Sequence, residues 1–183
     1  ITGLCTQPPI TLSGAQVGDV LIVTKPIGSG TLLAAEMRGL ARGGDVLACY
    51  NLRSAPHNDI AQRLKNAHAM TDVTGFGLAG HLAGMCDASG VHAQITLSDV
   101  PLMQGALDLA AAGVRSSLYA DNKSDPRVTA PDTAQGALMF DPQTGGGLLA
   151  AVPRDMADAI AADHDIWIIG DIQDGSGVSF NAP

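Results

Sequence analysis

The densest group of residues able to do chemistry is the stretch 71–77, with the sequence TDVTGFG, which holds one carboxylate, two hydroxyl groups and two glycines. Apolar residues follow at helical spacing, so these glycines fall at a helix start, where backbone N–H groups are unpaired. Such a place can hold an anion or a metal-bound phosphate. Asp72 is the hard oxygen ligand that Mg²⁺ prefers beside nucleotide phosphates. The stretch therefore predicts Asp72 as a metal ligand.

The same stretch also has a purely structural interpretation. An Asp or Thr before a helix is most often an N-cap, and a glycine there is most often a turn residue. Asp72 could serve as both cap and ligand. Residue types and spacing alone favour the cap, because helix starts outnumber phosphate sites.

Two further glycine-rich turns accompany this stretch. The first, at 25–31, follows a β-branched run and precedes a helix, an arrangement that often cradles phosphate. It lacks the full GxxxxGK[ST] and GxGxxG patterns, which favours a structural role for Gly28 and Gly30 in a tight turn and in close packing. The second turn, at 145–147, either allows a positive φ or lets a ligand or another backbone approach. We assign no catalytic residue to either turn and leave the nucleotide-binding residues open.

These turns must be positioned by alternating strands and helices. Residues 91–97 alternate apolar and polar side chains, as a half-buried strand does. Helical spacing places Leu33, Met37 and Leu40 on one inward face, and it predicts a helix from Phe76 to Ser89 that ends at Gly90. The other predicted strands are 19–25, 67–73, 138–140, 148–152, 166–169 and 178–180, and the other predicted helices are 43–67, 101–112 and 154–162.

Three further expectations concern a helix interruption, a loop and the fold class. Pro56 interrupts the 43–67 helix, with Ser54 as a plausible cap of its second piece. Residues 114–135 are predicted to form a solvated loop, whose length is typical of a functional or a mobile segment; we favour the mobile interpretation. Because the alternation lacks a strict βαβ rhythm, the expected fold class is α+β or layered α/β, with a mixed sheet and packed helices.

Composition sets the outer limits. The chain has 183 residues, of which 46% are hydrophobic and only 15% charged, which fits one well-buried domain. The formal charge of −8 and the 3% of aromatic residues exclude general binding to nucleic acid or to an acidic membrane surface. No apolar run approaches membrane-spanning length. We therefore expect a cytoplasmic protein with no nucleic-acid or membrane partner.

Cysteine usage supports the same compartment. Cys5, Cys49 and Cys86 are an odd number without CxxC spacing, which fits reduced thiols rather than a disulfide framework or a zinc site. The five histidines form no HxxxH pair. No Ser/His/Asp order and no close carboxylate pair support nucleophilic or glycosidic chemistry.

Three blocks carry a family resemblance over nearly the whole chain. They are 18–30 (GDVLIVTKPIGSG), 68–81 (HAMTDVTGFGLAGH) and 140–149 (FDPQTGGGLL). In this order they resemble selenophosphate synthetase, also called selenide, water dikinase. The middle block is specific to that family, and the other two occur more loosely across the aminoimidazole ribonucleotide synthetase-like superfamily.

The resemblance implies an enzyme that uses ATP and selenide to make selenophosphate, AMP and phosphate. It implies that Asp72 helps to hold Mg²⁺ at the ATP phosphates, which suits phosphoryl transfer because that reaction depends on positioning and charge neutralisation. The family's reactive Cys or selenocysteine, its partner Lys, its N-terminal aspartates and its glycine-rich ATP segment would all lie upstream of Ile1. Gly145 also stands where the family usually has Ser, so a hydroxyl contact there is in doubt.

The resemblance also implies a division of the chain. Residues 1–18 would be the end of an N-terminal ATP-binding domain plus a linker, with 1–3 as its last strand, and 19–183 would be the C-terminal α+β domain. This piece alone would be inactive and a monomer or weak dimer, whereas the full-length enzyme would be a homodimer. The alternatives are a related superfamily kinase or synthetase domain, such as a thiamine monophosphate kinase-like protein, and a non-catalytic interaction module.

Overall fold

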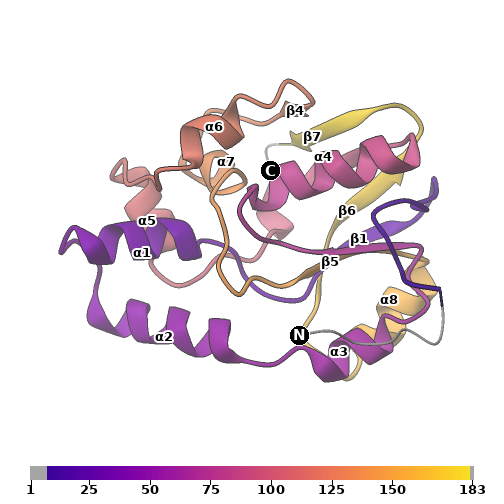
Figure 1. The fold of residues 1–183 in the computed structure, drawn as a ribbon, viewed down its shortest axis with the longest axis horizontal. Coiled ribbons are helices and arrows are strands. Elements are labelled where there is room, and N and C mark those ends of the chain that lie inside the picture. Colours follow the sequence, from indigo (N-terminus) through magenta and orange to yellow (C-terminus); the bar gives the residue numbers. More distant parts are fainter. Residues whose placement is uncertain (1–7, 182–183) are drawn as a thin grey trace.

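A central strand with two apolar faces organises the fold. In β1 (Val20–Val23), Leu21 and Val23 contribute to the larger hydrophobic core, while Val20 and Ile22 contribute to a smaller one. Successive strand residues point to opposite faces, so β1 must be covered on both sides. The computed structural model describes residues 8–181 and shows this arrangement (Figure 1).

The sheet has seven strands and mixed pairing. β3 (His92–Thr96) pairs with β7 (Gly177–Asn181) and β7 with β4 (Val128–Thr129) in parallel, whereas the other neighbours are antiparallel. The α+β class with a mixed sheet is therefore confirmed. The strand order across the sheet is β2 (Ala69–Asp72), β5 (Leu148–Val152), β1, β6 (Trp167–Gln173), β3 (His92–Thr96), β7 (Gly177–Asn181) and β4 (Val128–Thr129).

Helices cover both faces of the sheet. In Figure 1, α4 (Gly77–Ser89) lies on one side of the strands, and α3 (Asn58–Arg63) and α8 (Arg154–Ala161) lie on the other. The larger core includes α4, and the smaller core includes α8. The remaining helices are α1 (Ser29–Met37), α2 (Gly43–Ser54), the 3-10 helix η1 (Leu97–Asp99), α5 (Ala106–Ala111), α6 (Tyr119–Lys123) and α7 (Ala134–Leu138).

The helix after the TDVTGFG stretch forms largely as predicted. Ala79, Leu82, Ala83 and Cys86 are buried in the larger core, and α4 ends at Gly90 in the left-handed conformation. Phe76 is the exception, because it is the N-cap residue and its side chain is 68% exposed.

The inward face predicted for the first helix is wrong. Met37 is 83% exposed and Leu40 is 59% exposed. α1 instead packs against α5 and α2, and most of its buried residues are small. Gly28 permits the close approach, because a Cβ there would lie 2.5 Å from the Cβ of Ala106. The buried residues of α1 are Ser29, Thr31, Leu32, Ala34 and Ala35.

The predicted helix at 101–112 begins only at Ala106. Upstream, the Ile27 N–H donates to Pro101 O at 2.9 Å, and the Met103 N–H donates to Ile27 O at 2.8 Å. These bonds tie up backbone groups that a helix would use. The predicted cap Ser54 is also wrong, because Ser54 is the last residue of α2 and His57 is the N-cap of α3.

The region 114–140 differs most from prediction. The expected loop contains α6, β4 and the start of α7. The predicted strand at 138–140 is instead the end of α7 and a turn. The Thr133 side chain caps α7 by accepting the Gly136 N–H at 3.0 Å, and the Phe140 N–H donates to Ala137 O. A local cap therefore selected a helical turn for an apolar run.

Two expectations fall within the first seven residues. Cys5 and the predicted strand at 1–3 lie outside the described residues. Across residues 8–181, none of the helices is both long enough and apolar enough to span a bilayer.

Candidate functional site

Asp72 is the last residue of β2, and its side chain is exposed. It pairs in register with Leu148, and the following Val73 N–H donates to Gly147 O at 2.8 Å. The backbone at Asp72 and Val73 is therefore held by the end of the glycine-rich turn at 145–147 and by the first residue of β5. This places Asp72 at the end of an edge strand, facing solvent.

The capping interpretation of Asp72 does not hold. The N-cap of α4 is Phe76, and none of the described side chains caps this helix. Among the described residues, the Asp72 carboxylate accepts no hydrogen bond and forms no ion pair. An exposed carboxylate without a partner is free to bind a cation.

Both the backbone N–H and the backbone carbonyl of Thr74 are hydrogen-bonded. Its N–H donates to Nε2 of His81 at 3.0 Å, and its carbonyl accepts the N–H groups of Gly77 and Gln143. Its hydroxyl also lies 3.2 Å from the same Nε2. Burial lowers the pKa of His81, with the charge of Asp72 opposing that shift. A neutral ring with its proton on Nδ1 fits these contacts.

Gln143 joins the third block to the first. Its Oε1 accepts hydrogen bonds from the Gly28 N–H at 3.0 Å, from the Ser29 N–H at 3.1 Å and from the Ser29 hydroxyl at 3.1 Å. Its Nε2 donates to the carbonyl of Asp141 at 2.7 Å and to Oδ2 of the same residue at 3.2 Å. Together with its own N–H bond to Thr74, Gln143 connects all three glycine-rich turns.

Sequence reasoning missed Gln143 as a structural centre. A glutamine in a glycine-rich turn is expected to be solvated, whereas Gln143 is only 4% exposed. The signal that could have revealed it is the set of donors in the first block, which need a buried acceptor once the turns meet.

Asp141 is a buried carboxyl beside Gln143. Thr31 donates its hydroxyl to Oδ1 at 2.8 Å. Burial raises the pKa of Asp141 to about 6, although hydrogen bonds from Thr31 and Gln143 oppose the rise. Gly30 makes room for this contact, because a Cβ there would lie 2.8 Å from Oδ1 and 2.5 Å from Pro142 O. The structural role expected for Gly30 is therefore confirmed.

The triple-glycine turn holds a buried lysine. Lys25 donates from Nζ to Ala55 O at 2.9 Å and to Gly145 O at 3.3 Å, and burial lowers its pKa. Gly145 has a φ of +62°, and a Cβ there would lie 2.9 Å from Arg53 O. Its glycine is thus explained by backbone conformation and packing.

A magnesium ion would need further ligands beside Asp72. Among residues 8–181, no group of three or more His, Cys, Asp or Glu side chains could hold a metal. One exposed carboxylate fits the chemistry of Mg²⁺, which takes one or two protein carboxylates and completes its shell with phosphate oxygens and waters. Asp72 can therefore supply part of such a site.

The described cysteines are not placed for nucleophilic chemistry. Cys49 and Cys86 are both buried and free. Burial raises the pKa of Cys49, and it raises the pKa of Cys86 to about 11, so both remain thiols near neutral pH.

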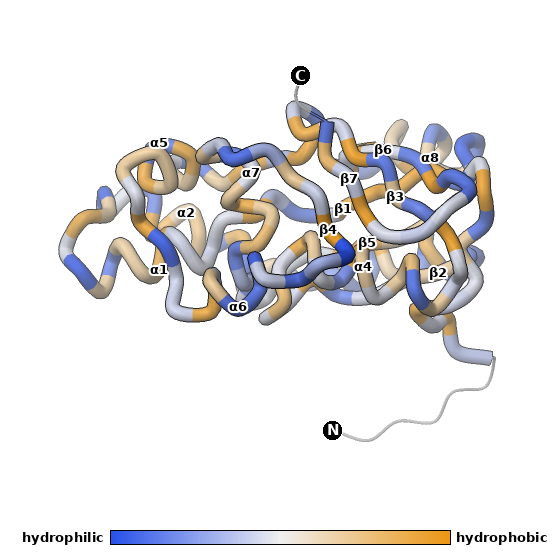
Figure 2. The backbone as a smooth tube through the Cα atoms, turned by 90° about the horizontal axis from the view of Figure 1, so that it is seen from above, coloured by the Kyte–Doolittle hydropathy of each residue, from blue (hydrophilic) through white to orange (hydrophobic). Residues whose placement is uncertain are grey.

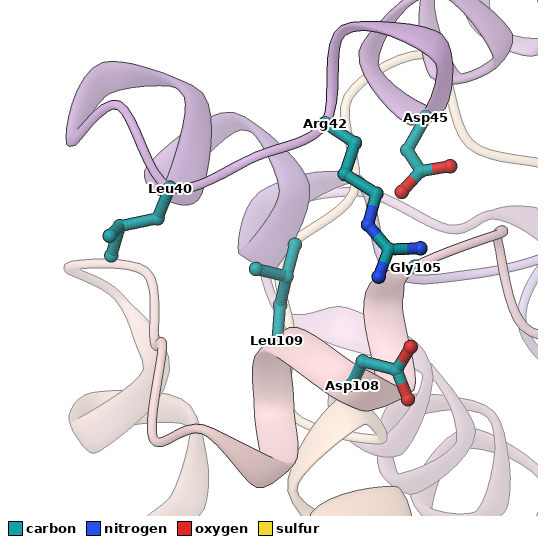
Figure 3. A pocket seen from close by; sticks show the side chains of 6 residues that line it. All are labelled: Leu40, Arg42, Asp45, Gly105, Asp108 and Leu109. Atoms are coloured by element: carbon teal, nitrogen blue, oxygen red, sulfur yellow. The ribbon is translucent and has the colours of Figure 1, made fainter.

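A separate pocket lies at the other end of the molecule. It has a volume of about 170 Å³ between the α1–α2 connection and α5 (Figure 3). Figure 2 shows α5 and β2 toward opposite ends, so this pocket is not part of the Asp72 region. Its lining residues are Leu40, Arg42, Asp45, Gly105, Asp108 and Leu109.

Comparisons with known proteins identify relatives over almost the whole chain. It is 36% identical over 186 residues to the selenide, water dikinase of Bdellovibrio bacteriovorus, covering 94% of this chain and 53% of that protein. It is 37% identical over 176 residues to the selenide, water dikinase of Aeromonas hydrophila, covering 91% of this chain and 51% of that protein. The chain thus spans about half the length of the curated relatives it matches.

Solved structures share the fold at lower identity. Thiamine-monophosphate kinase from Stenotrophomonas maltophilia matches with a TM-score of 0.68 and 23% identity, covering 94% of this chain and 52% of that one. Hydrogenase maturation protein HypE in complex with ATP matches with a TM-score of 0.71 and 17% identity, covering 94% of this chain and 50% of that one.

A protein-family model also matches most of the chain. The model of the AIR synthase related protein, C-terminal domain, matches residues 16–182. This match covers all three sequence blocks and every strand of the sheet. The chain belongs to the family of AIR synthase related protein C-terminal domains.

Proposed function

We propose that this chain is the C-terminal half of a selenide, water dikinase, which makes selenophosphate, AMP and phosphate from ATP and selenide. The observation that carries the proposal is Asp72 at the end of β2, exposed and without a partner among residues 8–181, beside three interlocked glycine-rich turns. The names of the sequence relatives support the choice of reaction.

Asp72 is the proposed magnesium ligand. When bound, Mg²⁺ would neutralise charge on the ATP phosphates, which is the main requirement of phosphoryl transfer. The remaining ligands would be phosphate oxygens, waters and carboxylates of the N-terminal domain. Register pairing with Leu148 and the Val73–Gly147 bond fix the backbone that presents Asp72.

The proposed enzyme has two domains. Residues 1–18 would end the N-terminal ATP-binding domain and form a linker, and 19–183 would form the C-terminal domain. The catalytic Cys or selenocysteine and its Lys partner would belong to the N-terminal domain, so this piece alone would be inactive. The full-length enzyme would be a cytoplasmic homodimer.

The sequence relatives favour this proposal over the superfamily alternative. Eight sequence relatives at 35–39% identity are named selenide, water dikinase or, in one case, selenide, water dikinase 2. The thiamine-monophosphate kinase structures are 19–23% identical, which supports a shared fold alone.

The test compares this chain with a longer chain extended upstream of Ile1. ATP consumption is measured with selenide and Mg²⁺, and selenophosphate is detected by phosphorus NMR. The expected result is product from the longer chain only. A folded longer chain that makes no selenophosphate would overturn the proposal and favour an interaction module.

A further inference from the structure

The residues around Asp72 contain one side chain with an unusual role. His81 lies one turn into α4, and its Nε2 accepts the Thr74 N–H at 3.0 Å. Here the ring is turned back onto the strand-to-helix connection, so it acts on the backbone between β2 and α4.

We propose that His81, in the tautomer that carries its proton on Nδ1, is a positioning residue that fixes the Thr74 backbone and thereby the direction of Asp72. The role rests on the proposed function only in that Asp72 is the proposed magnesium ligand. The contact itself stands on geometry alone.

Two side chains bond the backbone of the connection between β2 and α4: His81 accepts the Thr74 N–H, and Asn122 donates to Gly75 O at 2.9 Å. None of the described side chains caps α4, and the first-turn Ala79 N–H is used by Met139 O. The Thr74 N–H therefore depends on His81 for its partner among the described residues. A partly buried N–H without a partner would be costly, because it would lose its hydrogen bond to water as well.

The backbone on both sides of Asp72 is fixed, whereas the carboxylate is not. Upstream, β2 is locked to β5 by register, with Thr71 opposite Leu149. Downstream, Thr74 is locked by His81. Between these two anchors, the Asp72 side chain is exposed. A binding site is preorganised when the backbone that presents a binding side chain is fixed and the side chain itself stays accessible.

Nε2 of His81 is occupied by its contacts with Thr74. The nitrogen lies within hydrogen-bonding distance of both the N–H and the hydroxyl of Thr74. A metal on this nitrogen would have to displace the Thr74 N–H. The Phe76 ring also packs against the imidazole at a centroid distance of 5.8 Å, which restricts ring rotation. His81 therefore acts through Thr74 rather than as a ligand.

The experiment uses this chain labelled with ¹⁵N, without ATP, selenide or metal. Long-range ¹H–¹⁵N spectra at pH 7.5 report which nitrogen of His81 carries the proton. We expect the proton on Nδ1 and an unprotonated Nε2. A proton on Nε2 would overturn the proposal.

Two variants of His81 provide the second readout. His81→Gln keeps an acceptor near the position of Nε2, whereas His81→Phe keeps the ring shape and removes the acceptor. We expect the exchange rate of the Thr74 amide, relative to that of Ile172, to rise about tenfold in His81→Phe and by less than about threefold in His81→Gln, the size expected for one hydrogen bond. Ile172 donates to Asp19 O elsewhere in the sheet, so it reports general loosening.

An unchanged exchange ratio in His81→Phe would overturn the proposal, as would an equal rise in both variants. If His81→Phe does not fold, the tautomer of His81 measured in the native protein still tests the proposal. Because neither measurement involves catalysis, a negative result here leaves the proposed reaction standing, and an inactive longer chain leaves the His81 contact standing.

Discussion

Gln143 accepts hydrogen bonds from both the backbone N–H and the hydroxyl of Ser29, although 114 positions separate the two residues. The same amide group donates to Asp141 on its other side. This pair joins the glycine-rich turn before α1 to the one before β5. The junction, rather than any single glycine, holds the turns together.

Gln143→Glu tests this junction. The substitution keeps an oxygen for Ser29, but it places a second oxygen against the carbonyl and carboxyl of Asp141. Two acceptors would then face each other in a buried site, and we expect a loss of about 3 kcal/mol in the free energy of unfolding. Urea denaturation at pH 7.5 measures it. Gln62→Glu, on the exposed face of α3, is the control and should change stability by less than ~0.5 kcal/mol. Equal effects of the two substitutions would contradict the role of Gln143.

Asp72→Asn separates ligand from structural roles. Asp72 is exposed and has no partner among the described residues. The thermal unfolding midpoint of the Asp72→Asn variant should therefore stay close to that of the native chain. In the longer chain, activity should fall by at least ~10²-fold, because metal binding supplies several kcal/mol of transition-state stabilisation. Asp174→Asn, also exposed, is the control and should retain activity. A large loss of thermal stability in Asp72→Asn would mean that the residue is mainly structural.

Asp141 predicts a specific pH dependence. Its folded-state pKa of about 6 is above the ordinary 3.8, so the folded state favours the protonated form. This contribution to stability is fully present below pH 3.8 and is lost as the pH rises through 6. Across that window the loss is about 3 kcal/mol, an order-of-magnitude value from two pKa units.

Asp141→Asn isolates this effect from other titrating groups. The free energy of unfolding of the native chain minus that of the variant should fall between pH 4 and pH 7. Urea denaturation at four pH values across this range measures the difference. A difference that does not vary with pH would show that Asp141 titrates normally.

Gly145→Ser tests the conformational reason for the triple glycine. A serine at φ +62° is strained, and its Cβ would press on Arg53 O at 2.9 Å. We expect a loss of about 1–2 kcal/mol in the free energy of unfolding. Gly75→Ser is the matched control, because a Cβ there meets nothing within 4 Å. A stabilising effect of Gly145→Ser would show that the turn readily changes conformation.

The association state gives a further prediction. The chain should be a monomer or weak dimer, with a monomer mass of 18.6 kDa. Light scattering across a tenfold range of protein concentration measures it. A tight dimer at the lowest concentration would contradict this expectation.

Much of the fold could be predicted because its signals are local. Strand alternation at 91–97 and the helix from the TDVTGFG stretch to Gly90 depend on side chains close in sequence, and both were confirmed. Prediction failed where a distant contact or a cap decided the outcome. Thr133 made 138–140 part of a helical turn, and contacts with Ile27 delayed the start of α5.

The sequence by itself determined the α+β class, the three turns and Asp72 as a candidate ligand, because residue type, spacing and resemblance are all readable along the chain. Only the tertiary structure decided that Asp72 is not a cap, that His81 holds Thr74 and that Gln143 joins the turns. Each of these depends on which donor meets which acceptor after the sheet has formed. Such pairing is set by burial and geometry between distant segments, which a linear pattern does not contain.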